Sequence, residues 1–464
     1  MSAPLVLFLV TGIFAVGAAL LRGRPRPSAI LAASGAAMLG LFALTAKLDE
    51  PFVFLGLSLK FGSTWSLLGR AFTLDEGNRA AVGFLFLAGA FIFAGAWAAR
   101  PERYLFSFGI LALGVVAGSL LIRPFLFAAV FLELAAMGSA LILVSPGYPA
   151  RRGGLRLLTL YTLAMLAILL AGWLLQSVGV AGGAPGESLR ATLLLALGFA
   201  ILMAVPPFHH WLPAAAEGAH PYALSFVAVL LQSAGLFFLL RFLDSYQWLR
   251  DNPDLFAGIR LAGTAMVCFG GVWALAQKSF SRVVAYALVT DFGVSLLAVG
   301  TQRAEGYELA LGLVGSHALG LAVCGLGGAM LRKSGGKDDV ASLAGSGYRS
   351  PLAAGAALAG LLSLSGFPLA AGFPGRWALL AILSPLDRFA AAAVVLSCLA
   401  VSGAAARWLG TFIQPPASDE KIELTFGEGL FLGGGVAMCV LFGTFPQIFA
   451  VIFQVTRGLT NLVP

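Results

Sequence analysis

Charged residues are scarce in this sequence. Asp, Glu, Lys and Arg together make up 11% of the 464 residues, whereas hydrophobic residues make up 59%. A soluble globular protein carries about 25% charged residues, so this composition excludes that class. Apolar stretches of about 20 residues, the length that crosses a bilayer as a helix, recur along the whole chain. The composition therefore predicts a multi-pass membrane protein.

Cysteine and the patterns of cofactor sites are scarce as well. The chain has four cysteines, each alone in an apolar stretch: Cys268, Cys324, Cys398 and Cys439. Metal sites need Cys or His at short fixed spacings, and iron–sulfur clusters need several cysteines. Neither a glycine-rich dinucleotide fingerprint nor a phosphate-binding loop occurs. We therefore expect no metal, no cofactor, no redox centre and no catalytic residue in this chain.

The net charge of +8 lies in short loops between the apolar stretches, which argues against a nucleic-acid partner. We expect about fourteen spans. An even number of spans places both termini on one side of the membrane. Lys and Arg are more frequent in the loops on the side opposite the termini, so the positive-inside rule predicts that both termini face away from the cytoplasm. The expected span centres are Phe14, Met38, Ala90, Leu113, Ala135, Leu166, Leu197, Val229, Val267, Leu288, Leu319, Leu362, Val395 and Val436.

Proline and glycine interrupt two of the expected helices. The seventh contains Pro206 and Pro207, and the twelfth contains Gly366, Pro368 and Pro374. Proline removes a backbone donor and clashes with the preceding turn. At membrane depth such a break is tolerated only where protein or water satisfies the freed backbone groups. Corresponding breaks in two halves of a chain point to an inverted repeat with its site near the midplane.

The expected fold is therefore an all-α membrane protein of about fourteen transmembrane helices, two of them discontinuous, with an inverted repeat of two five-helix units. Residues 1–100 hold helices one to three, and residues 101–245 hold the first unit, helices four to eight. Residues 246–413 hold the second unit, helices nine to thirteen, and residues 414–464 hold the last helix.

A run of proline, histidine and tryptophan follows the first break. The run Pro207-Phe-His-His-Trp-Leu-Pro213 resembles the Pro-Phe-His-x-Trp-Leu-Pro motif of one family. That family comprises the antiporter-like proton-channel subunits of respiratory complex I, of multisubunit cation/proton antiporters and of membrane-bound hydrogenases. Segments similar to its other motifs follow the family order, at Phe131–Leu134, Arg282–Tyr286, Ser316–Ala318 and Gly366–Arg376.

The resemblance implies a membrane-arm subunit without a redox site, which translocates protons along a line of acidic and basic groups at the midplane. In the family a Glu in helix five is coupled to Lys in helix seven, Lys in helix eight, and Lys or Glu in helix twelve. Each charge changes the proton affinity of the next. The implied partners are homologous antiporter-like subunits and lipids, in a bacterial inner membrane or another energy-transducing membrane.

This chain departs from that pattern at three of the four positions. The helix-seven position is Leu202, the helix-eight position is at or beside Gln232, and the helix-twelve position is Arg376. Leucine and glutamine do not titrate, and arginine holds its proton throughout the physiological range. The acid of helix five, Glu133, is present, and Asp291 replaces the usual histidine of helix ten. The relay is therefore expected to be degenerate.

Six residues remain as candidates for proton transfer: Glu133, His209, His210, Asp291, His317 and Arg376. Each has a structural alternative. Glu133 is either a water-contacting acid or a vestigial, protonated one. The two histidines after the break either relay protons or bond to freed carbonyls. His317 and Asp291 are either relay groups or residues that form hydrogen bonds between helices. Arg376 is expected to neutralise an acid such as Asp291 or Glu133 as a fixed ion pair.

Three hypotheses for function follow. In the first, protons cross by a rewired path through Glu133, His209, Asp291 and His317. In the second, the chain is a non-conducting structural subunit, closed at Leu202. In the third, it is a membrane subunit of another machine, such as a hydrogenase or an inorganic-carbon uptake complex.

Overall fold

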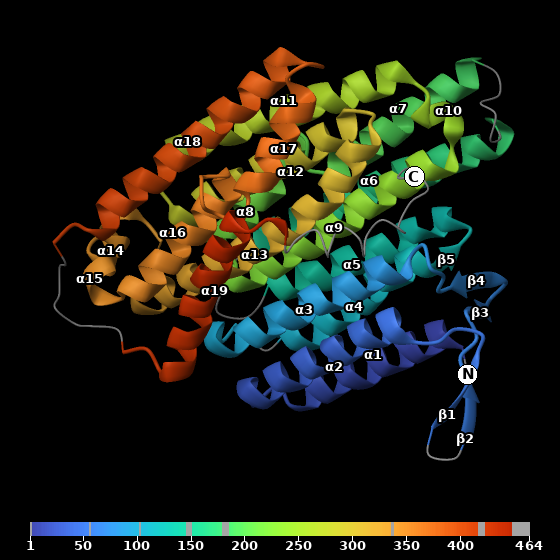
Figure 1. Ribbon diagram of the computed structural model, residues 1–464, viewed down its shortest axis with the longest axis horizontal. Coiled ribbons are helices and arrows are strands. Elements are labelled where there is room, and N and C mark those ends of the chain that lie inside the picture. Colours follow the sequence, from blue (N-terminus) through green and yellow to red (C-terminus); the bar gives the residue numbers. More distant parts are fainter. Residues whose placement is uncertain are drawn as a thin grey trace.

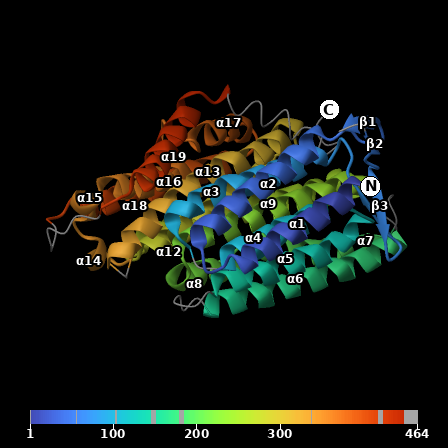
Figure 2. The same ribbon diagram turned by 90° about the horizontal axis from the view of Figure 1, so that it is seen from below.

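The computed structural model describes residues 2–54, 57–101, 104–144, 151–178, 185–335, 338–415 and 423–447. The long helices lie side by side along the longest axis of the molecule, and the N-terminus lies at one end (Figures 1 and 2). Of the segment expected to form the last helix, residues 416–422 and 448–464 lie outside the described part.

Twelve helices among the described residues are long and apolar enough to cross a membrane. They contain twelve of the fourteen expected span centres, and the other two, Leu197 and Leu362, lie in α7 and α16. The all-α membrane fold is therefore confirmed. The helices of the first half are α1 (Ala3–Leu20), α2 (Pro25–Thr45), α3 (Arg79–Ala99), α4 (Tyr104–Leu121), η1 (Phe125–Phe127), α5 (Ala128–Leu143), α6 (Arg151–Val178), α7 (Pro185–Leu202), η2 (Phe208–His210), α8 (Trp211–Gly218) and α9 (Pro221–Ser245).

The second half repeats long helices with short connecting ones. It consists of α10 (Gln247–Arg250), α11 (Pro253–Ala276), α12 (Phe280–Gly300), α13 (Ala304–Gly335), α14 (Val340–Leu343), α15 (Ser346–Arg349), α16 (Pro351–Ser365), α17 (Phe373–Leu383), α18 (Arg388–Phe412) and α19 (Phe426–Thr444). In each half the interrupted helix packs on the long helix that precedes it, α7 on α6 and α16 on α13. The inverted symmetry of two five-helix units stays a prediction.

Short strands were not expected, and the structure has them between α2 and α3. β1 (Pro51–Phe54) pairs with β2 (Leu57–Lys60), and β3 (Thr64–Leu67) pairs with β4 (Arg70–Thr73), both antiparallel. β5 (Ile122–Arg123), after α4, extends the second pair. Phe72 of β4 packs against Phe8 of α1 and Phe131 of α5. These strands cap the end of the bundle that holds the N-terminus (Figure 1).

Burial divides the helices into a centre and a periphery. The membrane-crossing windows of α9 and α13 are 100% buried inside the protein, and that of α12 is 94% buried. Those of α1 and α19 are only 33% and 22% buried, so these helices turn most of their side chains outward. An apolar outward face has no cost in lipid. The polar residues of α9, α12 and α13 therefore lie inside protein, where they need polar partners.

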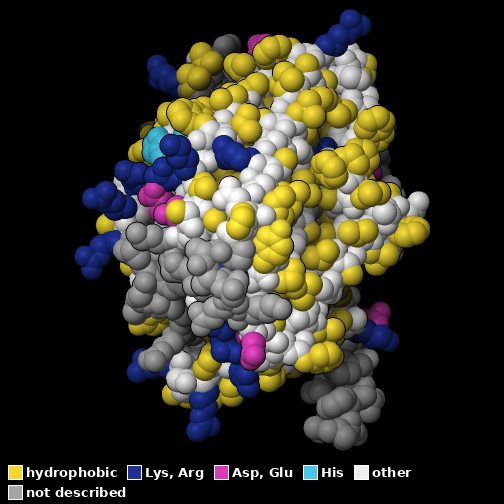
Figure 3. Space-filling model, turned by 90° about the vertical axis from the view of Figure 1, so that its left-hand side faces the viewer, with side chains coloured by type: hydrophobic (Ala, Val, Ile, Leu, Met, Phe, Trp, Pro, Cys, Tyr) yellow, Lys and Arg dark blue, Asp and Glu magenta, His cyan; other side chains and the backbone are white. Residues whose placement is uncertain are grey.

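The end of the bundle that carries α14 and α15 is basic. Figure 3 views this end, where Lys and Arg side chains project around the rim and acidic side chains are few. This is the end opposite the N-terminus (Figure 1).

The first helix break follows from the two prolines. α7 ends at Leu202, and Ala204 adopts a left-handed conformation with φ +55°. Because neither Pro206 nor Pro207 has a backbone N–H, the helical ladder stops before them. The chain then makes the short helix η2 and continues into α8.

The second break depends on glycine. α16 ends at Ser365, and Gly366 follows with φ +72°, the left-handed conformation that glycine adopts without steric cost. The N–H of Phe367 donates to the carbonyl of Leu362, which closes the last turn of α16. α17 begins at Phe373, with Pro374 in its first turn, where the missing N–H costs nothing.

Candidate functional site

The centre of the second half holds a buried cluster of opposite charges. Asp291 of α12 is 4% exposed, and His317 of α13 and Arg376 of α17 are each 2% exposed. Nη2 of Arg376 donates to Oδ1 of Asp291, and Nδ1 of His317 bonds to Oδ2 of the same carboxylate. Both oxygens of Asp291 therefore have a partner. The cluster brings together three of the six sequence-predicted candidates.

Arg376 is also part of the second helix break. Its Nη1 donates to the carbonyl of Gly372 at 3.2 Å, and its Nη2 donates to the carbonyl of Leu364, in the last turn of α16. A guanidinium has five N–H donors in a planar fork, so one side chain can satisfy carbonyls and carboxylate together. Arginine here is therefore both the charge partner of Asp291 and a donor that satisfies the interrupted backbone.

Two glycines make room for this side chain. A Cβ at Gly366 would lie 2.2 Å from Cδ of Arg376, and one at Gly372 would lie 2.6 Å from its Nη1. A Cβ at Gly372 would also lie 2.0 Å from the carbonyl oxygen of Ser363. Distances under 3.0 Å are not possible for real carbon contacts, so the arginine fits only because both positions lack a side chain.

The polar residues of the site lie close to the middle of their spans. Asp291 lies in Phe280–Gly300, and His317 lies in Ala304–Lys333. Gln232 lies in Pro221–Ser245, and Glu133 lies in Phe125–Leu143. Each is near the centre of its range, which corresponds to the bilayer midplane for a helix that crosses with little tilt. These residues therefore lie near the centres of their helices.

Glu133 belongs to a different set of contacts. Oγ1 of Thr162, on α6, donates to Oε1 of Glu133 at 2.6 Å. Oε2 of Glu133 is buried and has no hydrogen-bond partner among the described residues. The neighbouring Tyr161 directs its hydroxyl to the carbonyl of Leu202 at 3.5 Å. Glu133 of α5 is thus bonded to α6. None of these hydrogen bonds joins it to the Asp291 cluster.

Leu202 and Gln232, the other two positions singled out in the sequence, are both buried. Leu202 is 2% exposed at the last residue of α7, followed by buried Met203. The amide of Gln232 donates to Oγ of Ser295 at 3.5 Å, and Ser295 donates to the carbonyl of Asp291 at 3.3 Å. Gln232 is therefore connected to the helix of the acidic cluster, whereas the side chain of Leu202 is apolar and buried.

The two histidines after the first break do not join either set. His209 is buried and packs on the rings of Phe269 and Tyr286, with centroids 4.6 Å and 6.0 Å away. Its Nδ1 has no hydrogen-bond partner among the described residues. His210 is exposed. The roles predicted for them stay predictions.

A second buried carboxylate was missed. Glu428, in the first turn of α19, is 2% exposed and pairs with Arg100 at 3.1 Å and with Lys333 at 3.9 Å. The sequence contained a signal for it, because Thr425 three residues earlier completes a helix capping box. This ion pair ties α19 to the ends of α3 and α13. No group of three His, Cys, Asp or Glu side chains suited to a metal ion occurs in the part of the chain that the structure describes.

Known proteins share this architecture over the whole chain. A family model described as the transmembrane region of NADH:quinone oxidoreductase/Mrp antiporter proteins matches residues 174–401. Subunit 13 of the NADH-quinone oxidoreductase of Thermus thermophilus is 30% identical over 471 residues, which cover 96% of this chain and 95% of that one. Formate hydrogenlyase subunit 3 of Escherichia coli is 28% identical over 275 residues, 53% of this chain and 44% of that one.

The fold agrees with a solved structure as well. A chain of respiratory complex I from Thermus thermophilus, determined with bound NADH, superimposes with a TM-score of 0.78. The superposition covers 99% of this chain and 100% of that chain at 23% identity.

Proposed function

Since this chain belongs to the NADH:quinone oxidoreductase/Mrp antiporter family of membrane subunits, we propose that it is an antiporter-like subunit in the membrane arm of a complex I-like assembly. Its proton-responsive centre is the cluster of Asp291, His317 and Arg376. The chain carries no redox chemistry itself and responds to electron transfer elsewhere in the assembly through changes of charge at the midplane.

The buried ion pair between Arg376 and Asp291 carries this proposal. An intramembrane acid paired with a base is costly to insert and is found where ions move or where charge is sensed. Arginine holds its proton, so Asp291 keeps a permanent counter-ion. His317 completes the cluster, because its Nδ1 bonds to the second oxygen of the Asp291 carboxylate.

Leu202 interrupts the relay between the two halves. Charge coupling weakens with distance, and a titratable residue between two sites passes it on. Glu133 accepts a hydrogen bond from Thr162, and Gln232 donates one to Ser295, which lies on the same helix as Asp291. With leucine at the end of α7, no side-chain hydrogen bond between described residues joins these two sets. Glu133 is therefore decoupled from the cluster, and the complete four-position relay of the family does not operate here.

The assembly supplies the partners. The peripheral helices expose large apolar side chains, among them Ile13 and Trp173 at 68% and 66%. We infer that these faces contact lipid and homologous antiporter-like subunits on either side in the membrane arm. The basic end with α14 and α15 (Figure 3) is assigned to the cytoplasm of a bacterial inner membrane or its equivalent, which places both termini on the other side.

The test compares two isosteric changes in the intact assembly, purified through a tag on this chain. Asp291→Asn removes the charge that holds Arg376, and Glu133→Gln removes the acid of the first half. We expect the ratio of protons translocated per electron to fall with Asp291→Asn and to stay unchanged with Glu133→Gln. Equal loss in both variants would contradict the interruption at Leu202, and no loss with Asp291→Asn would contradict the assignment of the centre.

One relative supports a second candidate function. The similarity to formate hydrogenlyase subunit 3 of Escherichia coli fits a membrane subunit of a hydrogenase-type or inorganic-carbon uptake complex. The same purification discriminates between the two. Quinone-module subunits that copurify with the tagged chain support the complex I-like assembly, whereas hydrogenase or carbon-uptake subunits in their place support the second candidate.

A further inference from the structure

An apolar cavity separates α7 from α11, and α9 forms its inner wall. α7 packs along α6 and α11 packs along α12, and the cavity between them has a volume of about 570 Å³. Ligand pockets in proteins enclose about 300–1,000 Å³. The apolar side chains that line this α7–α11 cavity come from all three helices and include Leu193, Phe199, Leu239, Phe242, Leu255 and Ile259.

The α7–α11 cavity opens sideways to the outer surface of the bundle. Leu189 and Leu193 of α7 line it and are 59% and 61% exposed. On α11, one of the membrane spans, the lining residues Leu255, Gly258 and Ile259 recur every three or four positions and form one stripe. Apolar surface on the outside of a membrane span faces acyl chains. The cavity is therefore continuous with lipid.

The cavity is about as long as one leaflet of the bilayer is thick. Along α7 its lining runs from Ser188 to Ala200, which is about 18 Å. Along α11 it runs from Asp254 to Ala262, which is about 12 Å. One leaflet of the hydrocarbon core is about 15 Å thick, whereas a helix that crosses the membrane needs about 30 Å. The cavity therefore fits an acyl chain and is too short for a membrane-crossing helix of another subunit.

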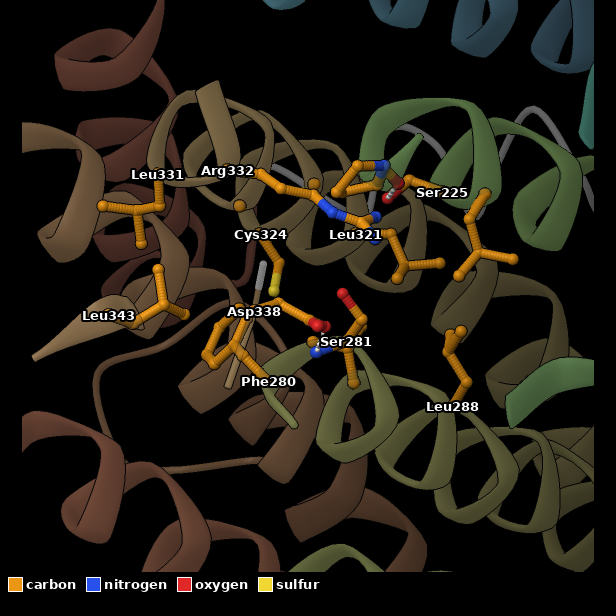
Figure 4. A pocket seen from close by; sticks show the side chains of 15 residues that line it. Ser225, Phe280, Ser281, Leu288, Leu321, Cys324, Leu331, Arg332, Asp338 and Leu343 are labelled. Carbon is orange, nitrogen blue, oxygen red and sulfur yellow. Dashed lines mark hydrogen bonds between the residues drawn. The ribbon is translucent and has the colours of Figure 1, made fainter. Parts of the chain in front are cut away.

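A cavity at the other end of α9 differs in size. It lies between α9, α12 and α13 (Figure 4), and its volume is about 20 Å³, which is room for about one water molecule. Its charged groups are bonded within the protein, because Asp338 accepts from the N–H of Ser281 at 3.0 Å and Arg332 donates to the carbonyl of Ala219 at 2.7 Å. An acyl chain has no room there.

The polar residues of the α7–α11 cavity gather at one end of it. Ser188 and Asp254, in the first turns of α7 and α11, line the cavity together with Asn252 and Trp248. This is the end of the bundle that holds α10 and the N-terminus (Figure 1). Further along the helices, the lining residues are apolar, among them Phe199 and Ile259. A cavity that is polar at the membrane surface and apolar at depth complements a phospholipid.

Trp248 supplies a donor that lacks an acceptor. Its Nε1 is buried and has no hydrogen-bond partner among the described residues. An indole N–H only donates, and burying it without an acceptor is unfavourable. Tryptophan is enriched at the level of the headgroups, where its apolar ring and its N–H both find partners. The ester and phosphate oxygens of a phospholipid are acceptors at this level.

The charges around this end of the cavity are of both signs. Asp254 is exposed, and its backbone N–H, not its carboxylate, bonds to the side chain of Asn252. Glu187 is a second acid, in the first turn of α7, and Arg190 is an exposed base on the same helix. A headgroup that carries an ammonium and a phosphate complements both signs. The acids would repel a headgroup with negative charge alone.

We propose that the α7–α11 cavity binds one phospholipid with an ammonium headgroup, such as phosphatidylethanolamine. An acyl chain fills the cavity between α7 and α11, an ester or phosphate oxygen accepts from Nε1 of Trp248, and the ammonium pairs with Asp254. Ala200 and Val205, on either side of the end of α7, also line the cavity, so the chain supports the first helix break. This site goes beyond the proposed function, which does not depend on it.

The test uses phosphatidylethanolamine with a photoactivatable diazirine in its acyl chain, in vesicles that carry the intact assembly. After irradiation, mass spectrometry of the peptides locates the cross-links. Gly258→Phe fills the cavity, because Gly258 lines it and no atom lies within 4 Å of an added Cβ. Gly434→Phe on α19 is the matched control. It is also an exposed helical glycine with no atom within 4 Å of an added Cβ.

We expect cross-links on α7 and α11 in the unchanged chain, loss of most of them in Gly258→Phe, and no loss in Gly434→Phe. Trp248→Phe keeps an aromatic ring and removes the donor, so we expect about a two- to tenfold loss of labelling. Full labelling in Gly258→Phe overturns the site. An absence of cross-links on α7 and α11 in the unchanged chain, as when a neighbouring subunit covers the cavity, overturns it as well.

Phosphatidylglycerol with the same diazirine tests the headgroup. We expect it to label the cavity less than phosphatidylethanolamine does in the unchanged chain. Asp254→Asn removes the carboxylate, so the difference between the two lipids should shrink in that variant. Equal labelling of the unchanged chain by both lipids overturns the preference for an ammonium headgroup.

Discussion

Arg376 donates to Asp291 from 85 residues further along the chain, and the same guanidinium satisfies a carbonyl of the broken helix α16. One side chain thus joins Asp291 of α12 to the helix break between α16 and α17. A lysine would supply a point charge without the planar fork. Arg376 is therefore both the counter-ion of Asp291 and a donor to the interrupted backbone.

The first prediction concerns the stability of this pair. Asp291→Asn leaves the Arg376 charge buried without its partner, so we expect a loss of about 3–5 kcal/mol, the usual cost of breaking one side of a buried ion pair. The measurement is the thermal unfolding of the purified assembly. Because Asp291→Asn with Arg376→Gln removes both charges, we expect that double variant to recover at least half of the loss. Additive losses would mean that the two residues do not interact.

The second prediction concerns the glycines around the arginine. Gly372→Ala places a methyl group against the Ser363 carbonyl and the guanidinium, so α16 and α17 must move apart. We expect about 1–3 kcal/mol of destabilisation from this overpacking, together with loss of proton coupling. Gly355→Ala in α16 is the matched control, because no atom lies within 4 Å of its added Cβ. Similar melting temperatures for the two variants would contradict the close fit at Arg376.

Hydropathy and proline were sufficient to predict most of the fold. All fourteen expected span centres lie within described helices, because a long apolar run in a membrane has few alternatives to a helix. Both breaks lie at the predicted prolines and glycines, since a missing N–H and a left-handed turn are local properties. The strands β1 to β5 were not predicted: β1 to β4 form two local hairpins that the search for apolar spans overlooked, and the pairing of β4 with β5 joins residues distant in sequence.

The candidate site could be predicted only in part. Asp291, His317 and Arg376 were each singled out as polar groups in apolar spans, a property of the single residue. Which acid pairs with Arg376 depends on how α12, α13 and α17 pack, and no spacing in the sequence encodes that. The donation of Arg376 to backbone carbonyls was missed for the same reason, although Gly366 and Gly372 were visible as small residues beside it.

The third prediction concerns pH and a histidine outside the spans. His220 caps α9, with Nδ1 accepting from the N–H of Tyr222 at 3.2 Å. Burial, with a smaller contribution from Arg332, lowers the pKa of His220 to about 4, from its ordinary value of 6.5. The unfolded chain therefore takes up a proton at a higher pH than the folded one. Stability is fully present above pH 6.5 and is lost as the pH falls towards 4.

The size of this effect can be measured between pH 7.5 and pH 5.0. From the two pKa values of His220, we expect a loss of about 2 kcal/mol over that interval. His220→Asn is the control, because asparagine is also a good helix cap and does not titrate in this range. The difference in unfolding free energy between the two proteins should change as the pH falls, because only the unchanged chain loses stability by protonation of residue 220. A constant difference would show that His220 does not contribute to acid sensitivity.

The last prediction restores the missing base. Leu202→Lys puts an amine at the end of α7, beside the carbonyl to which Tyr161 directs its hydroxyl. A lysine there titrates readily when buried and can couple Glu133 to Gln232 and the Asp291 cluster. We expect Glu133→Gln to lower the ratio of protons translocated per electron in the Leu202→Lys background, although it leaves that ratio unchanged when residue 202 is leucine. The cost of a buried lysine, about 2.5–3.5 kcal/mol, requires that assembly be verified first.

The most direct test of the interruption at Leu202 is the proton-to-electron ratio of the intact assembly in a cycle of four proteins: the unchanged chain, Glu133→Gln, Leu202→Lys, and both changes together. If Leu202 interrupts the relay, Glu133→Gln has no effect with leucine at position 202 and lowers the ratio with lysine there. If Glu133→Gln already lowers the ratio in the chain with Leu202, the two halves are coupled through another path and Leu202 does not interrupt the relay.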